Sequence, residues 1–103
     1  MNDSITSGLI GKYCIVRGES FGVLAGTVTA IDGPNVTLAN ARRLWFWDGA
    51  ASVSQLAMEG VKNPGACKFS MAVNSILLRN YIEVIPCSAE AQAIIEKVKV
   101  WKR

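Results

Sequence analysis

The stretch GVLAGTVTAIDGPNVTL (residues 22–38) carries the clearest indication of fold in this chain. Apart from Leu24, small and β-branched residues fill positions 22–31, where successive side chains of a strand would point to alternate sides. Asp32-Gly33-Pro34-Asn35 then concentrates turn-forming residues. Val36-Thr37-Leu38 resumes a β-forming composition. The stretch therefore predicts two strands folded back on each other as an antiparallel hairpin.

The segments on either side of this hairpin extend the pattern of β-strands. Runs of β-branched and aromatic residues bounded by glycine, proline or asparagine are typical of strands. Such runs predict strands at residues 12–17, 22–31, 36–38, 40–47 and 75–86, with a short extended piece within 68–73.

Helical spacing occurs in two places. Ser52 and Gln55 form a capping box of the S-x-x-Q type before one short helix, and Ser88 precedes a second. Residues 1–11 are expected to be a polar lead-in, followed by one domain over residues 12–103. The predicted fold class is α+β: a mostly antiparallel sheet of about five to six strands with two short helices, in a single compact domain.

The composition is apolar for one small domain. Half of the 103 residues are hydrophobic, and the mean hydropathy is +0.27. The longest uncharged stretch, residues 20–31, is much shorter than the about 20 apolar residues that span a bilayer. No basic residue precedes Lys12, so the N-terminus is not typical of a secretory signal. We therefore expect no membrane association and a homo-oligomer that buries the apolar excess between subunits.

The residue types also bear on chemistry. The chain has no histidine, and its three cysteines include no C-x-x-C pair, so we expect no metal, no cofactor and no enzyme activity. A formal charge of +3 suits an anionic small molecule but is weak for a protein that binds duplex nucleic acid.

The segment Ala41-Arg42-Arg43-Leu44-Trp45-Phe46-Trp47 is the most informative for function. In a regular strand, alternation places Arg43, Trp45 and Trp47 on one face and Arg42, Leu44 and Phe46 on the opposite face. Either face joins a guanidinium to aromatic surface, which can clamp a phosphate and stack on a base. The alternative is that the rings are core or subunit interface and the arginines are solvated.

Two weaker features complete the set of candidate ligand-binding residues. Ser20 and Phe21 lie in a glycine-flanked segment whose hydroxyl and amides could hold a phosphate, although a plain turn is the alternative. Phe69 offers another stacking ring, and Asn80 is expected on an apolar strand face, where its amide needs partners. The candidates are Ser20, Phe21, Arg42, Arg43, Trp45, Trp47, Phe69 and Asn80.

Three stretches, RGESFGVLAG (17–26), LANARRLWFWDGAASVSQLAMEGVKNPGACKF (38–69) and IEVIPCSAEAQAIIEKVKVWK (82–102), carry a family resemblance. The most specific element is the A-R-R-x-W-x-W-x-G-A block at residues 41–50. The chain resembles small phage proteins of the first-described Thoeris anti-defence family. That resemblance implies a cytoplasmic sponge, acting in the infected bacterial host, that binds cyclic ADP-ribose isomers without cleaving them, with cyclic oligonucleotides of CBASS immunity as further ligands.

The resemblance also implies a symmetric oligomer, a dimer or a hexamer, with ligand contacts near subunit interfaces. By motif it places these contacts at Arg43, Trp45 and Phe69, and further at Arg42 and Asn80. The competing hypothesis is a non-catalytic phage module that blocks a host protein partner. Such a module would use its arginine and tryptophan residues in a protein interface and would have no affinity for small molecules.

Overall fold

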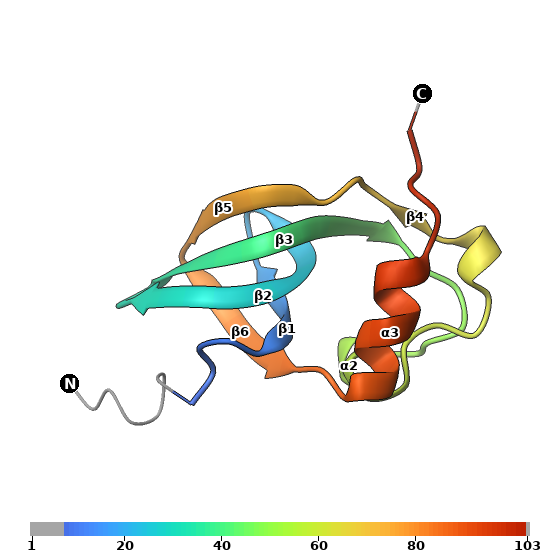
Figure 1. The fold of residues 1–103 in the computed structure, drawn as a ribbon, viewed down its shortest axis with the longest axis horizontal. Coiled ribbons are helices and arrows are strands. Elements are labelled where there is room, and N and C mark those ends of the chain that lie inside the picture. Colours follow the sequence, from blue (N-terminus) through green and yellow to red (C-terminus); the bar gives the residue numbers. More distant parts are fainter. Residues whose placement is uncertain (1–7, 103) are drawn as a thin grey trace.

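A computed structural model describes residues 8–102, which form a six-stranded sheet and two α-helices (Figure 1). This confirms the predicted α+β class and the single compact domain. Of the expected lead-in, residues 1–7 lie outside the described part. The strands are β1 (Tyr13–Gly18), β2 (Gly22–Asp32), β3 (Asn35–Phe46), β4 (Lys68–Phe69), β5 (Val73–Arg79) and β6 (Tyr81–Pro86). The helices are α2 (Val53–Glu59) and α3 (Ala89–Lys97), with a 3₁₀ turn at Pro64–Ala66.

The sheet curls, because the consecutive strands β5 and β6 pair with strands on opposite sides of it. Its order is β4-β3-β2-β1-β6, and β5 pairs with the same side of β3 as β4 does; all of these strand pairs are antiparallel. Only Asn80 separates β5, which pairs with β3, from β6, which pairs with β1. Figure 1 shows the two strands meeting at a sharp bend. Asn80 makes this bend with a φ of 60°, in the left-handed region that asparagine tolerates better than most residues.

The predicted hairpin is present, but two strand boundaries differ from the prediction. Residues 36–38 and 40–47 were expected as separate strands, whereas β3 runs unbroken from Asn35 to Phe46. The strand contains a bulge at Asn40, where φ is 50°. Three steps along β3, from Ala39 to Arg42, lie opposite two steps along β2, from Thr27 to Ala25. The expected single strand at 75–86 is instead divided into β5 and β6 at Asn80.

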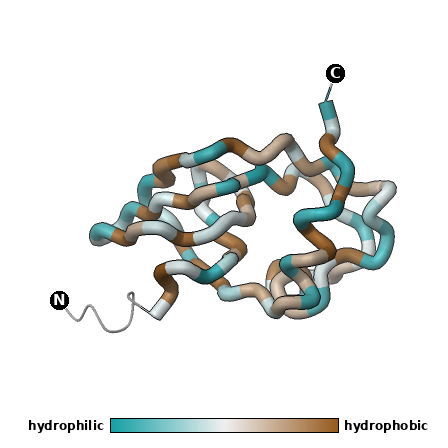
Figure 2. The backbone as a smooth tube through the Cα atoms, viewed as in Figure 1, coloured by the Kyte–Doolittle hydropathy of each residue, from teal (hydrophilic) through white to brown (hydrophobic). Residues whose placement is uncertain are grey.

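The curled sheet has a separate hydrophobic core on each face. Tyr13 and Ile15 of β1 pack with the helices, while Cys14 and Val16 pack inside the curl with residues of β2, β3 and β5. These four consecutive side chains of β1 are all buried, which explains the continuous run of mostly apolar residues in this strand. Hydrophobic residues accordingly recur along the strands and α3 rather than forming one block (Figure 2).

Serine caps hold the two helices at one end of the sheet. The Ser52 hydroxyl accepts a hydrogen bond from the Gln55 amide at 3.1 Å, as predicted, and Gln55 accepts in return from the Ala51 amide at 2.8 Å. The Ser88 hydroxyl accepts from the Ala91 amide at 3.0 Å and donates to the Met58 carbonyl at 2.6 Å, which joins the helices. Neither helix of the described residues is long and apolar enough to cross a membrane.

Candidate ligand-binding site

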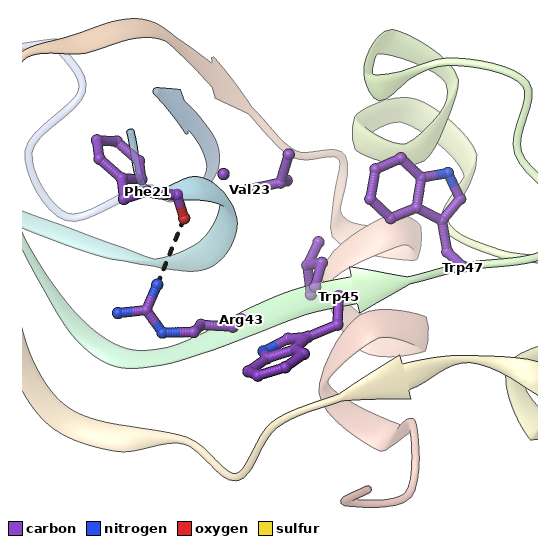
Figure 3. Close-up of a pocket in the computed structure, with 7 residues that line it drawn as sticks. Phe21, Val23, Arg43, Trp45 and Trp47 are labelled. Carbon is purple, nitrogen blue, oxygen red and sulfur yellow. Dashed lines mark hydrogen bonds between the residues drawn. The ribbon is translucent and has the colours of Figure 1, made fainter. Parts of the chain in front are cut away.

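A cavity opens where β3 separates from β2. The ladder between these strands ends at the pair Leu24–Arg43, and β3 then pairs with β4 through Leu44 and Phe69. The cavity has a volume of about 540 Å³ and is lined by Phe21, Gly22, Val23, Arg43, Leu44, Trp45 and Trp47 (Figure 3). Four of the candidate residues, Phe21, Arg43, Trp45 and Trp47, therefore gather in one place although they come from two separate segments.

The β1–β2 turn positions Phe21 at the rim of this cavity. Its ring lies directly over Gly18, where an added Cβ would overlap the ring atoms. Gly22 follows with a φ of 81°, which lets the chain turn sharply into β2. Ser20 is exposed in the same turn and does not line the cavity. The two glycines of this segment therefore serve to position Phe21: Gly18 makes room for its ring, and Gly22 makes the turn.

Arg43 has a fixed backbone and a lightly engaged side chain. Its amide donates to the Ser70 hydroxyl at 2.8 Å, and its carbonyl accepts from the Ser70 amide at 2.9 Å. Its guanidinium makes one long hydrogen bond of 3.4 Å, to the Phe21 carbonyl (Figure 3). No carboxylate among residues 8–102 forms an ion pair with Arg43. The remaining guanidinium N–H groups are therefore available to an anion at the cavity.

Trp45 lies at an irregularity of β3 and is 63% exposed. Its ring centroid is 5.8 Å from that of Trp101, at an interplanar angle of 50°. The Lys68 ammonium lies 5.4 Å from the centroid of the Trp101 ring. Trp47 is half-buried and packs against the core beneath the helices. Aromatic surface therefore extends from the cavity toward the chain end.

Strict strand alternation does not hold in the aromatic block. It predicted Phe46 on the same face as Arg42 and Leu44, both of which are buried, but Phe46 is 50% exposed. The pairing of β3 with β4 shifts between Leu44 and Phe46, and Trp45 and Phe46 are both exposed at this irregularity.

Arg42 has a structural role that the sequence did not indicate. Its guanidinium is buried and donates to the carbonyls of Ser70 at 2.8 Å, Ile95 at 3.0 Å, Val98 at 2.9 Å and Phe69 at 3.4 Å. Burial lowers the pKa of Arg42. The side chain ties the C-terminal end of α3 to the segment after β4, where a cation also complements the helix dipole. Arg42 does not line this cavity, so the structure does not bring it together with Arg43 and the tryptophans.

Phe69 and Asn80 also lie elsewhere than expected. Phe69 is fully buried, with its ring 5.5 Å from the Arg42 guanidinium carbon, so it presents no surface for stacking. Asn80 is exposed at the bend between β5 and β6 rather than buried on an apolar strand face. Its conformation, and not an amide contact, accounts for the residue type.

Five residues of this surface were not among the predicted site residues: Gly22, Val23, Leu44, Lys68 and Trp101. In the sequence, Val23 indicates only a β-strand and no binding role. Trp101 reaches Trp45 because the chain end runs beside β4, through a bridge between Phe69 and Val100 and a 2.9 Å hydrogen bond from the Trp101 amide to the Phe69 carbonyl. Contacts between segments so distant in sequence leave no local pattern.

The chemical character of the cavity is cationic and aromatic. Its lining holds one arginine and no acidic side chain, which suits a ligand that carries phosphate and a planar base. Within residues 8–102, no three cysteine or acidic side chains gather as a metal site would need.

A protein-family model described as "Domain of unknown function (DUF6948)" matches residues 11–95. This match spans every strand and most of α3. Among curated proteins, none matches the chain.

Proposed function

The chain belongs to the DUF6948 family, and we propose that it is a sponge for a cyclic nucleotide immune signal. In this proposal the protein binds and sequesters the signal without cleaving it, in the cytoplasm of a phage-infected bacterium. The ligand is a cyclic ADP-ribose isomer made by TIR proteins, with CBASS cyclic oligonucleotides as a second ligand class. The single observation that carries the proposal is the lightly engaged Arg43 guanidinium in a cavity walled by Phe21, Trp45 and Trp47.

The size and the charge of the cavity support a nucleotide ligand. Its volume of about 540 Å³ lies within the roughly 300–1,000 Å³ typical of small-molecule sites. Arginine binds phosphate oxygens bidentately, and tryptophan rings provide faces on which a base can stack. The exposed ring of Trp45 and its neighbour Trp101 enlarge the stacking surface beyond the cavity wall.

The lining also supports binding without turnover. General acid–base catalysis of hydrolysis needs a group that exchanges a proton near neutral pH. The side chains that line the cavity are aromatic, aliphatic or arginine, and arginine stays protonated. Sequestration needs only affinity, which these residue types provide.

A homo-oligomer is part of the same proposal. Several large apolar side chains on the outer strands remain exposed in the single chain, among them Val73 (43%) and Leu77 (60%) of β5 and Ile82 (50%) of β6. Such surface is typical of an interface that becomes buried on association. We propose a dimer or a hexamer, which light scattering of the purified protein would test.

Calorimetric titration with cyclic ADP-ribose isomers and cyclic oligonucleotides tests the sponge directly. Arg43→Ala should weaken binding by about tenfold or more, because a charge-assisted contact contributes roughly 1.5–3 kcal/mol. Arg79→Ala is the matched control: Arg79 is an exposed arginine at the other end of the β3 ladder, paired with Asn35. It should leave affinity unchanged.

Chromatography of the ligand released by heating completes the experiment. Recovery of the intact molecule supports sequestration, whereas a breakdown product would show that the protein is an enzyme. No binding by any member of the panel would refute the proposal.

A module that blocks a host protein is the second candidate, favoured by the adjacent exposure of Trp45 and Phe46. Large aromatic side chains of this kind are common anchors of protein interfaces. Under this hypothesis, a host protein would co-purify with the wild type but not with a Trp45→Ala, Phe46→Ala variant, and the nucleotide panel would give no heat.

A further inference from the structure

A second cavity opens beside the chain end and adjoins the site described above. It has a volume of about 280 Å³ and is lined by Lys99, Trp101, Lys102 and residues of the 3₁₀ turn at Pro64–Ala66. Trp45 lines the first cavity and Trp101 lines this one, and the centroids of their rings are 5.8 Å apart. The two cavities therefore meet at a pair of tryptophan rings.

The backbone around β4 brings these two rings together and leaves both exposed. Phe69 of β4 pairs with Leu44 of β3 and also forms the bridge to Val100, so β4 lies between β3 and the chain end (Figure 1). Trp45 is 63% exposed and Trp101 is 38% exposed. Aromatic faces that the fold leaves open in this way can stack on the planar groups of a bound molecule.

Positive charge lies at the ring pair and in both cavities. The Lys68 ammonium is 5.4 Å from the centroid of the Trp101 ring. Arg43 lines the first cavity, and Lys99 and Lys102 line the second. In the part of the chain that the structure describes, none of these four cations forms an ion pair, and no acidic side chain lines either cavity. We call these residues together the tryptophan-pair surface: Arg43, Trp45, Lys68, Lys99, Trp101 and Lys102.

This surface suits a ligand with several phosphates and several unpaired bases. An acidic peptide would pair with the cations but leave the rings uncovered, and duplex nucleic acid keeps its bases inside the helix. In a single strand, bases are free to stack on aromatic side chains while phosphates contact lysine and arginine. We propose that the tryptophan-pair surface binds single-stranded nucleic acid, with adjacent bases on Trp45 and Trp101 and phosphates at the four cations.

The linings also indicate that this binding does not depend on base sequence. Neither cavity is lined, among the described residues, by asparagine, glutamine or an acidic side chain, which are the groups that read base edges along with arginine. Stacking is tolerant of sequence because every base has an aromatic face. The proposal does not need the sponge, because Lys99, Trp101 and Lys102 lie outside the first cavity.

Fluorescence anisotropy of the full chain with labelled oligothymidylate and oligouridylate, each of about eight nucleotides, tests this binding mode. An abasic oligomer of equal length is the matched control, because it keeps the phosphates and lacks the bases. We expect the DNA and RNA probes to bind within about threefold of each other and the abasic oligomer about tenfold more weakly. The logarithm of the affinity should fall with the logarithm of salt concentration at a slope of about 2–3, for three to four neutralised phosphates. Equal binding of the abasic oligomer, or no binding of any probe, would overturn the proposal.

Three variants separate this site from general attraction to a basic protein. Trp101→Leu should bind oligothymidylate about fivefold or more weakly and the abasic oligomer as the wild type does. Lys99→Gln should lower the salt slope by about 0.7, whereas Arg79→Gln, at the other end of the β3 ladder, should not change it. An equal effect of Arg79→Gln would refute the site. If Trp101→Leu folds poorly, the abasic comparison on the wild type still decides. Lys99→Gln should bind cyclic ADP-ribose isomers as the wild type does, so this proposal and the sponge can fail separately.

Discussion

The side chains of Arg42 and Arg43 leave β3 on opposite faces and have opposite surroundings. Arg42 pairs across the ladder with Ala25 of the core beneath the helices, and its guanidinium donates to four backbone carbonyls. Arg43 pairs with Leu24 of the other core and makes one long side-chain hydrogen bond. The two adjacent arginines thus have different roles. Arg42 links β3 to the end of α3 and to the segment after β4, and Arg43 remains available at the cavity.

This division predicts different costs for removing each arginine. Arg42→Met should lower the free energy of unfolding by about 2–4 kcal/mol, because buried carbonyls at the end of α3 lose their donor. Arg43→Ala should change it by about 0.5 kcal/mol or less. Urea denaturation followed by circular dichroism measures both. Similar losses in the two variants would contradict the assignment.

The bend at Asn80 provides a test of backbone strain. Asn80→Gly should leave stability unchanged or slightly higher, because glycine adopts the observed φ of 60° without strain. Asn80→Val should lower the free energy of unfolding by about 1–2 kcal/mol, because a β-branched residue is disfavoured there. Thermal and urea unfolding measure the pair. If glycine proved as damaging as valine, the asparagine side chain itself would be the essential feature.

Gly18 predicts a link between the first turn and the ligand cavity. In Gly18→Ala, the added methyl group would overlap the Phe21 ring and push it from its place at the cavity rim. We expect weaker nucleotide binding than in the wild type, measured by calorimetry, with the β-sheet signal retained in circular dichroism. Gly65→Ala is a suitable control, because a Cβ there meets no atom within 4 Å. Unchanged affinity in Gly18→Ala would show that Phe21 does not contribute to binding.

Two cysteines predict how stability depends on pH. Burial raises the pKa of Cys14 to about 11, and burial together with the neighbouring Cys14 raises that of Cys87 to about 12. An unfolded thiol titrates near 8.5, so at higher pH the folded chain holds more protons than the unfolded chain does. The stabilising effect is complete below about pH 8.5 and is lost as the pH rises toward 11–12.

Urea denaturation between pH 7 and 10.5 measures this effect. The free energy of unfolding should decline above pH 8.5 in the wild type and decline less steeply in Cys87→Ala. Parallel curves for the two proteins would show that the Cys87 thiol titrates alike in both states.

Much of the fold could be predicted because its signals are local. The Asp32-Gly33-Pro34-Asn35 turn, the serine caps of α2 and α3 and the change from strand to helical spacing each involve residues close in sequence. The strand number also came out near six, although one predicted strand was divided and two were joined. Both errors lie at asparagines with positive φ, where the backbone bends without a glycine or proline to mark the place.

Local sequence alone determined the α+β class, the positions of the turns and caps, and the grouping of arginine with tryptophan, because each depends on neighbouring residues. Only the tertiary structure decided which arginine is buried. Arg42 and Arg43 are adjacent in the same strand, and which of them is buried follows from the ladder register and from α3. The α3 end supplies the carbonyls of Ile95 and Val98, which lie 53 and 56 residues after Arg42 in the chain. The same long-range packing buried Phe69, brought Trp101 to Trp45 and left the buried Tyr13 hydroxyl without a hydrogen-bond partner among residues 8–102. Burial depends on what the distant chain brings to each face of a strand, and a single strand's pattern does not contain that information.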